Sequence, residues 1–319
     1  MELNKRLNHR AWRLAEKCRS LAEEIKIKSY DDLSGAKILD FGVDTPGTIE
    51  AGISLALICL ADLAEVEVVR PHSDELPLLQ VQVRTDHPLS ACIAGQYAGW
   101  PLSHEKYFAM CSGPARVCRG KEELLTTYNL AASEEQAVGI LETNTLPNRS
   151  VIESFADECG VTPENVTLCI ARTASIPGTL QVVARSIETT LHKLHELSFD
   201  LSTVHSAFGS APLPPIPTDD LTALGWTNDA ILYGAHTHLW VESSDEVIEA
   251  IGTKIPSNHS SDFGIPFQQI FEKYERDFYK IDKMLFSPAK VVIHNLNSGR
   301  VFQFGEIRND ILSSAFGLS

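Results

Sequence analysis

Arg185 and Glu188 stand three residues apart in a segment, residues 179–197, whose apolar residues recur at helical spacing. Side chains three apart on a helix project from one face, about one turn apart. A carboxylate placed this way is a candidate general base toward water. An arginine beside it would keep that carboxylate ionised and offer a fork of hydrogen-bond donors. The alternative is an ion pair on a solvated helix face, and the polar, turn-forming residues 173–178 before the helix favour an active site.

Four short segments are rich in glycine and small polar residues, a composition that by default is typical of loops. They are residues 85–88, 95–100, 111–116 and 227–229. Glycine lets a backbone approach a ligand closely, and residues 112–116 could supply donors to an anion. None of the four matches a phosphate-binding loop or a dinucleotide fingerprint.

Cysteine and histidine residues offer two other kinds of site. Cys111 or Cys92 with a distant histidine is an alternative nucleophilic pair, although no neighbouring residue favours the thiolate. Two histidine pairs, His236 with His238 and His192 with His195, would each share one face of an element. Neither pair has a third ligand nearby in sequence, so no metal site is predicted.

Charge and composition exclude several classes of protein. The 319 residues include 27 Lys and Arg against 42 Asp and Glu, a net charge of −15, which argues against binding nucleic acid or an anionic membrane. Seven cysteines without a C-x-x-C pair suggest no disulfide framework. The N-terminus is charged and amphipathic, and the longest apolar stretch, residues 53–61, is too short to cross a bilayer. We therefore expect a cytoplasmic protein.

The elements that must position these residues alternate between helices and strands. Helices are predicted at residues 1–26, 48–60, 147–160, 179–197, 218–232 and 266–278, and strands at 38–41, 66–69, 78–83, 137–141, 166–171, around 239, and in a hairpin of 290–295 with 300–304. The proline-rich residues 211–217 are predicted to be a loop or an extended crossover. This order predicts an α/β (mixed α+β) chain of two domains, residues 1–150 and 151–319, with a substrate pocket between them.

Read together, many collinear segments resemble the methenyltetrahydromethanopterin cyclohydrolase family. The resemblance runs nearly from end to end. The matching segments are residues 39–52, 85–88, 106–110, 112–116, 173–176, 185–189, 227–229, 277–282, 285–286 and 288–289.

The resemblance implies a homotrimer of two-domain subunits that uses a tetrahydromethanopterin derivative as its coenzyme substrate, with no tightly bound cofactor. The family's Arg-x-x-Glu pair falls on Arg185 and Glu188 as catalytic residues, and a short substrate-binding segment falls on Gly95, Gln96 and Tyr97. Archaeal members carry Lys at the position of Tyr97, so this chain departs from their pattern there.

The implied reaction adds water to the methenyl group and gives 5-formyltetrahydromethanopterin, a step of one-carbon metabolism. The methenyl carbon lies between two nitrogens that share a positive charge, so it needs an aimed water molecule rather than a metal. Glu188 is the expected base, and backbone donors at Gly95 and Gln96 would stabilise the hydrated intermediate. Tyr97 would pack on the pterin or donate a hydrogen bond. Two alternatives stay open: a cyclohydrolase acting on another reduced pterin such as tetrahydrofolate, and a non-catalytic pterin-binding protein.

Overall fold

The computed structural model describes residues 6–71 and 76–318 and has a mixed α/β fold. Residue contacts divide the chain into two compact units. Unit 1 comprises Met1–Ala64 and Ser90–Gln181, and unit 2 comprises Glu65–Leu89 and Val182–Ser319. This division differs from the predicted boundary at residue 150 because three strand pairs join segments that lie on opposite sides of such a cut.

Unit 1 is built on a six-stranded sheet in the order β1-β2-β8-β7-β6-β5. The central strands β2, β8 and β7 run parallel, and the outer pairs are antiparallel. Strand β8 lies between β2 and β7, which is why residues 166–171 belong to the first unit. The strands are β1 (Lys28–Asp31), β2 (Lys37–Gly42), β5 (Trp100–His104), β6 (Tyr107–Ser112), β7 (Ala137–Glu142) and β8 (Val166–Ala171).

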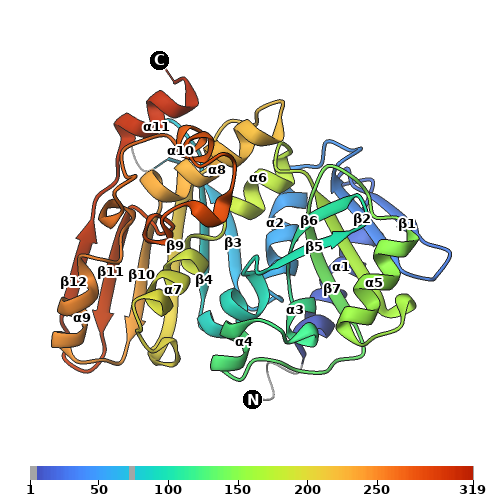
Figure 1. Cartoon of the computed structure of the whole chain (residues 1–319), viewed down its shortest axis with the longest axis horizontal. Helices are drawn as coiled ribbons and strands as arrows, with labels where there is room; N and C mark the ends of the chain where they lie inside the picture. The colour runs from blue at the N-terminus through green and yellow to red at the C-terminus, as the bar shows by residue number, and fades with distance from the viewer. Residues whose placement is uncertain (1–5, 72–75, 319) are drawn as a thin grey trace. The chain divides into compact units, whose positions relative to one another are not determined.

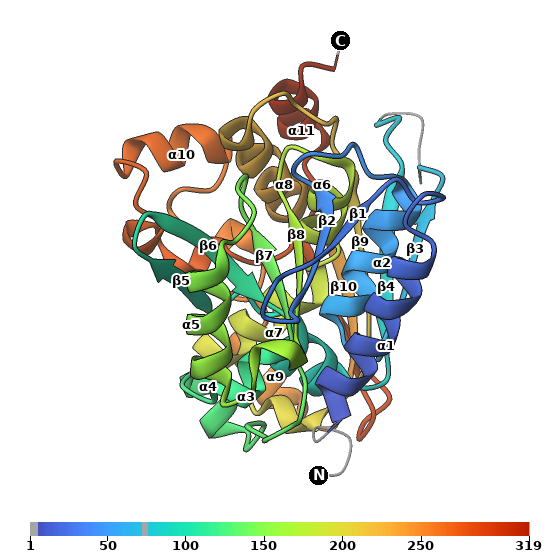
Figure 2. The ribbon, with the colours of Figure 1, turned by 90° about the vertical axis from the view of Figure 1, so that its right-hand side faces the viewer.

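Helices cover both faces of this sheet. Successive residues of a strand point to opposite faces, so Leu168 packs with helix α5 (Arg149–Cys159) and Cys169 with helices α1 (Leu7–Ser20) and α2 (Ile49–Cys59). Figure 2 shows α5 on one side of β7 and β8, and α1 with α2 on the other. A sheet buried on both faces explains the apolar β8, whose six residues are all buried. Unit 1 also contains the short helices α3 (Ala115–Arg119), α4 (Glu123–Thr127) and η3 (Pro163–Asn165).

Unit 2 holds a second six-stranded sheet, in the order β12-β11-β10-β9-β4-β3, which Figure 1 labels from β12 to β3. Only β10 and β11 pair in parallel. The early hairpin of β3 and β4 joins this sheet through β9, so residues 65–89 belong to the second unit. The strands are β3 (Glu65–Val69), β4 (Gln80–Thr85), β9 (Val204–Pro212), β10 (His236–Val241), β11 (Lys290–Asn295) and β12 (Val301–Gly305).

Strand β10 shows how this sheet is oriented. Its residues alternate between half-buried His236, His238 and Trp240 and buried Thr237 and Leu239. Helix α7 (Ser186–Glu196) contacts the buried side, where Thr190 Oγ1 donates to Thr237 Oγ1 at 3.1 Å.

The other helices of unit 2 are α8 (Asp220–Gly234), α9 (Asp245–Gly252), α10 (Phe267–Lys273) and α11 (Asn309–Phe316), with the 3-10 turns η4 (Leu201–Thr203), η5 (Ser257–His259), η6 (Phe278–Lys280) and η7 (Lys283–Leu285). In the described part of the chain, no helix combines the length and apolar character needed to span a membrane.

Most predicted elements are confirmed within a few residues, including the hairpin of β11 and β12, whose turn has Gly299 at φ +74°. The first helix was predicted too long, because α1 ends at Ser20 rather than at residue 26. The chain then passes through turns up to Lys26 (φ +53°) before it enters β1. Residues 1–5 of the predicted helix lie outside the described residues. The helix predicted at 266–278 ends at Lys273. Strands β1, β5, β6 and β9 were not predicted, and β9 takes in the first two residues of the predicted proline-rich loop.

The predicted helix of residues 179–197 is wrong as a single helix. Helix α6 (Ile176–Val183) ends before Ala184, and α7 begins at Ser186. Arg185 lies between them with non-helical backbone angles (φ −93°, ψ 10°). Apolar spacing alone does not reveal this break, because both helices bury side chains at similar intervals.

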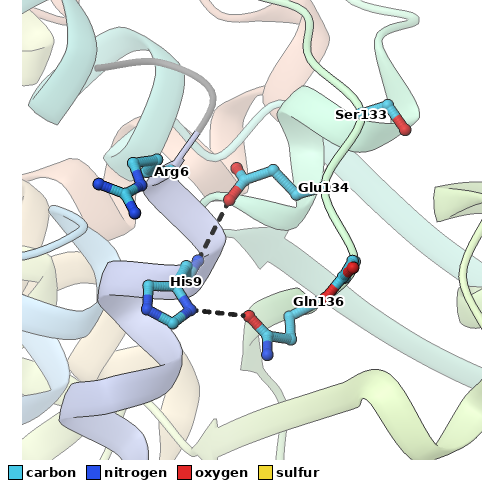
Figure 3. A pocket seen from close by; sticks show the side chains of 6 residues that line it. Arg6, His9, Ser133, Glu134 and Gln136 are labelled. Carbon is cyan, nitrogen blue, oxygen red and sulfur yellow. Dashed lines mark hydrogen bonds between the residues drawn. The ribbon is translucent and has the colours of Figure 1, made fainter. Parts of the chain in front are cut away.

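The N-terminus of α1 is capped by a side chain distant in sequence. The Glu134 carboxylate accepts from the backbone N–H groups of Asn8 (3.0 Å) and His9 (3.2 Å), two of the four donors that a helix start leaves unpaired. Figure 3 shows Glu134 beside His9, whose ring also contacts Gln136. Asn8 is fully buried and extends this link, because its amide accepts from Val138 N (2.9 Å) and donates to the Pro114 carbonyl (3.0 Å).

Asp229 joins α8 to α10 in unit 2. Its Oδ1 accepts from the Phe267 backbone N–H at 2.7 Å, and its side chain is almost fully buried. Burial raises the pKa of Asp229 to about 7, against the partial opposition of that hydrogen bond. Asp262, also in unit 2, behaves differently: burial raises its pKa, but bonds from Lys273 Nζ (2.6 Å) and the Tyr274 hydroxyl (2.9 Å) outweigh burial and lower it.

We predict that Asp229→Asn stabilises the protein at pH 8 more than at pH 5. The folded pKa of Asp229 lies above the unfolded value of about 3.9, so the wild-type protein loses stability as pH rises from about 4 through 7. An amide keeps the acceptor and avoids the charge, a gain on the order of 2 kcal/mol at pH 8. Thermal unfolding at both pH values measures this gain. Asp262→Asn is the control with the opposite sign, destabilising at neutral pH; a pH-independent effect of Asp229→Asn would contradict the prediction.

Candidate active site

The two predicted catalytic side chains lie at the start of α7. Arg185 is the residue before the first turn, and Glu188 lies within that turn. Their exposed fractions are 7% and 5%, which excludes the alternative of a solvated ion pair on an open helix face. A carboxylate in the first turn is also favoured by the positive end of the helix dipole. The break before Ser186 therefore brings both charged groups to the end of a buried helix.

Helix α7 is held firmly against the sheet of unit 2. A Cβ placed on Gly209 of β9 would overlap Ser186 Oγ and lie 3.0 Å from Ile187 Cγ1, so only glycine allows this approach. Farther along the helix, buried Lys193 donates through Nζ to the Met284 carbonyl. Burial lowers the pKa of Lys193 to about 8, which nearby carboxylates only partly oppose. These contacts fix the direction of the first turn, and so the placement of Glu188.

The predicted substrate-binding segment forms a π-helix rather than a loop. Helix η2 (Leu89–Gln96) ends with Gly95 and Gln96, and the Tyr97 N–H donates to the Cys92 carbonyl at 2.8 Å, the i to i+5 bond of such a helix. π-helices are rare and frequent at functional sites. Gln96 is fully buried, and Tyr97 is half-buried. Its small and polar residues are as typical of a loop as of this helix, so the sequence does not distinguish the two.

Gly95 is required by close packing. A Cβ there would lie 2.7 Å from the Cys59 carbonyl oxygen of α2, closer than side chains approach backbone in proteins. The Gly95 carbonyl accepts from the Gly113 N–H at 2.8 Å. The end of the π-helix is therefore fixed between α2 and the turn after β6.

The side chain of Arg116 was missed as a contributor to this region. Residues 112–116 were expected to offer donors to an anion, but Arg116 is fully buried and its donors are used inside unit 1. Nη1 donates to the carbonyls of Ile93 (3.1 Å), Ala94 (3.3 Å) and Gly95 (3.4 Å), and Nε donates to Glu122. In the sequence, only the position of Arg116 at the end of the small-residue segment 112–116 indicated a role for it.

Other segments of the resemblance are explained by turn geometry. The Asp40 carboxylate accepts from the N–H groups of Gly42 (2.9 Å), Val43 (2.6 Å) and Asp44 (2.9 Å) and so closes the turn after β2. Ser175 Oγ accepts from the Gly178 N–H at 3.0 Å and stabilises the start of α6. These residues shape loops through hydrogen bonds and require no ligand.

The thiol and histidine alternatives gain no support from the structure. Cys111 is fully buried, and burial raises the pKa of its thiol, which opposes nucleophilic use. His238 Nδ1 lies 3.1 Å from His294 Nε2. Across residues 6–71 and 76–318, no group of three or more His, Cys, Asp or Glu side chains is placed to hold a metal ion.

A polar surface depression at the start of α1 (Figure 3) contains none of the predicted site residues; it is lined by Arg6, His9, Ser133, Glu134, Glu135 and Gln136.

Comparison with known proteins decides the family. The family model described as "Cyclohydrolase (MCH)" matches residues 6–316. The chain belongs to the methenyltetrahydromethanopterin cyclohydrolase family. Membership in this family makes the chain a hydrolase acting on a cyclic amidine.

Relatives from bacteria and archaea agree with this assignment. A protein of Rhodopirellula baltica named methenyltetrahydromethanopterin cyclohydrolase is 51% identical over 291 residues, covering 90% of this chain and 87% of its own. Proteins of the same name from Methylobacillus flagellatus (42% identical, covering 90% of this chain and 88% of theirs) and Methanococcoides burtonii (40% identical, 93% of both chains) also match. The similarity therefore includes both units of the cyclohydrolase.

We predict that Gly209→Ala lowers the free energy of unfolding of this cyclohydrolase by about 1 to 3 kcal/mol, because the added methyl group must displace the first turn of α7. Chemical denaturation measures the loss. Ser186→Ala supplies a double-mutant control: the Ser186 hydroxyl is buried without a hydrogen-bond partner among the described residues, so its removal should not destabilise. The cost of Gly209→Ala should be smaller when Ser186 is Ala, and equal costs in the two backgrounds would refute the contact.

Proposed function

We propose that this cyclohydrolase interconverts 5,10-methenyltetrahydromethanopterin and 5-formyltetrahydromethanopterin, with Glu188 as the general base and Arg185 as its partner. The observation that carries the assignment of residues is the burial of both charged groups at the start of α7. Family membership supports the reaction, and the relatives are named for the same coenzyme. The proposal includes the predicted interdomain pocket for the coenzyme, which stays a prediction.

The chemistry asked of Glu188 is the removal of one proton from water. The positive methenyl carbon already attracts the water oxygen, so the rate depends on where the water lies and how readily it loses a proton. A carboxylate in a buried position exchanges few hydrogen bonds with solvent and keeps a fixed direction toward the attacking water. In the hydrated intermediate the bond from the methenyl carbon to the second nitrogen then breaks, that nitrogen takes the proton of the added hydroxyl group, and the formyl group stays on the first nitrogen. In the reverse reaction the protonated carboxyl returns its proton to the departing hydroxyl group.

The proposed role of Arg185 follows from the planar shape of its guanidinium group. It stabilises the ionised state of Glu188 and directs one N–H toward the oxygen that becomes the formyl group. An ammonium group would supply the charge without two parallel donors. We therefore assign Arg185 both an electrostatic and an orienting role.

The segment Gly95–Gln96–Tyr97 is proposed to contact the coenzyme. Backbone donors at its first two residues would stabilise negative charge on the hydrated intermediate, and Tyr97 would pack on the pterin or donate a hydrogen bond. The rigid end of the π-helix supports this role, since a binding segment that is already ordered loses little entropy when substrate binds.

We predict that Glu188→Gln lowers kcat by roughly 10² to 10⁴ at saturating substrate, because an amide cannot accept the proton. The decrease in methenyl absorbance during hydrolysis measures the rate. Glu196→Gln, at the far end of the same helix, is the matched control and should retain activity. Turnover by folded Glu188→Gln near the wild-type level would remove Glu188 as the base.

We also predict that Arg185→Lys is nearly as harmful as Arg185→Gln. Both variants lose the fork, and only the first keeps the charge. Comparing kcat for the two separates the roles: equal losses indicate orientation, whereas a lysine variant close to wild type would show that charge alone suffices.

The proposal also covers the pterin coenzyme that carries the one-carbon unit and the oligomeric state of the enzyme. Parallel assays with methenyltetrahydromethanopterin and methenyltetrahydrofolate distinguish the two carriers, and a preference for the folate would overturn the proposed substrate. Binding without turnover of either would favour a pterin-binding protein. We also propose, from the family resemblance, that the enzyme works in the cytoplasm as a homotrimer with no tightly bound cofactor.

A further inference from the structure

Arg116 is a charged group buried in unit 1 that the proposed chemistry does not use. Its side chain has no exposed surface, although arginine rarely gives up water completely. Such burial is tolerated only when the guanidinium donors find partners. The direction of those donors shows what the residue holds in place.

One side of the guanidinium donates hydrogen bonds to the end of the π-helix. Nη1 lies 3.1, 3.3 and 3.4 Å from the carbonyl oxygens of Ile93, Ala94 and Gly95. Carbonyls in the last turn of a helix have no partner within the helix and carry its negative dipole end. A cation at this point is therefore favoured by the helix dipole, and at Gly95 it adds a second donor to the carbonyl that already accepts from the Gly113 N–H.

The other side is fixed by a carboxylate and an aromatic ring. Glu122 accepts from Nε through Oε1 (2.9 Å) and Oε2 (3.1 Å) and also pairs with Nη2. The guanidinium carbon lies 5.1 Å from the centre of the Tyr97 ring, within the range of a cation–π contact. A Cβ on Gly99 would overlap both Glu122 and Tyr97, so the three groups are closely packed.

We propose that Arg116 is a positioning residue for the cyclohydrolase reaction: it holds Gly95, Gln96 and Tyr97 in their binding arrangement through the π-helix carbonyls and the Tyr97 ring. This inference rests on the proposed role of that segment in contacting the coenzyme. Arg116 itself acts through the segment and is not assigned a contact with substrate.

The shape of arginine is essential to this role. One planar group reaches three carbonyls, a carboxylate and a ring face, whereas a lysine ammonium has three donors around a single point. Arg116→Lys keeps the charge but cannot satisfy both sides. The last turn of the π-helix and the Tyr97 ring would then lose a common support.

The adjacent helix turn offers a matched control. Arg119, also on α3, pairs through Nε with Glu158 at 3.0 Å, and its guanidinium carbon lies 4.7 Å from the Trp100 ring. It thus has the same kinds of partner as Arg116 without the bonds to the π-helix carbonyls. Arg119→Lys removes a comparable arginine–carboxylate–aromatic contact elsewhere in the same unit.

The test compares kinetics of Arg116→Lys and Arg119→Lys with methenyltetrahydromethanopterin. We expect kcat/KM of Arg116→Lys to fall by about 10- to 100-fold, through a higher KM and a lower kcat, the scale of a misplaced binding group. Arg119→Lys should stay near wild type even if its melting temperature falls. Equal kcat/KM in the two variants, measured well below their melting temperatures, would overturn the proposal.

A second measurement does not depend on activity. Amide hydrogen exchange of the peptide containing residues 92–97 should be faster in Arg116→Lys than in wild type and unchanged in Arg119→Lys, since the Tyr97 N–H bond to the Cys92 carbonyl loses its support. Unchanged exchange in Arg116→Lys would also overturn the proposal. If that variant does not fold, Glu122→Gln against Glu158→Gln gives the same comparison with Arg116 still present.

These two measurements separate this inference from the proposed function. Wild-type protein without turnover would reject the proposed function, while hydrogen exchange would still show whether Arg116 orders the segment. Normal wild-type turnover with faster exchange but unchanged kcat/KM in Arg116→Lys would retain the function and reject the positioning role.

Discussion

A charge taken out of water must be met by opposite charge or by hydrogen bonds, and this requirement governs both units of the cyclohydrolase. In unit 1 the guanidinium of Arg116 meets helix carbonyls and Glu122, and the carboxylate of Asp40 meets three backbone N–H groups. In unit 2 the Lys193 ammonium meets the Met284 carbonyl. Only the Asp40 bonds close the turn that follows their own strand, whereas the Arg116 bonds join α3 to the π-helix η2 and the Lys193 bond joins α7 to η7. The buried charges therefore fix the relative placement of short elements and turns.

Both segments that we propose for the reaction occur where a helix departs from the regular α form. The chain before α7 breaks at Arg185, and the segment before β5 winds as a π-helix that ends at Gln96. A regular α-helix directs its side chains in a repeating pattern. A break in the helix, or the wider turn of a π-helix, changes the direction of the backbone and side chains at that point. Such irregular backbone is stable only when surrounding contacts compensate for it. Gly209 against Ser186 and Gly95 against the Cys59 carbonyl provide that close support.

The sequence was informative where one physical rule dominated. Strand β8 was predictable because a sheet covered on both faces needs an unbroken apolar run, and the turn at Gly299 because its backbone conformation favours glycine. Spacing and family resemblance predicted the Arg185 and Glu188 pair, whose catalytic role stays a prediction. The break between α6 and α7 was not predicted, since the apolar pattern continues across it.

Other features depend on tertiary contacts that local sequence cannot report. Strand β9 carries small and polar residues, Ser206, Gly209 and Ser210 among them, and becomes a central strand through pairing with β4 and β10. The buried role of Arg116 depends on Glu122 and on carbonyls more than 20 positions earlier in the chain. The discontinuous units have the same cause, because strand order in a sheet is set by pairing rather than by position in the chain.

This discontinuity has a consequence for synthesis on the ribosome. The hairpin of β3 and β4 emerges early, but its sheet partner β9 follows only after all remaining residues of unit 1 have been made. A two-stranded hairpin is marginally stable alone and exposes backbone groups that attract other strands. Unit 1 can therefore complete its sheet while the nascent chain still holds β4 with one edge unpaired, and the second sheet closes late, through contacts of high sequence separation.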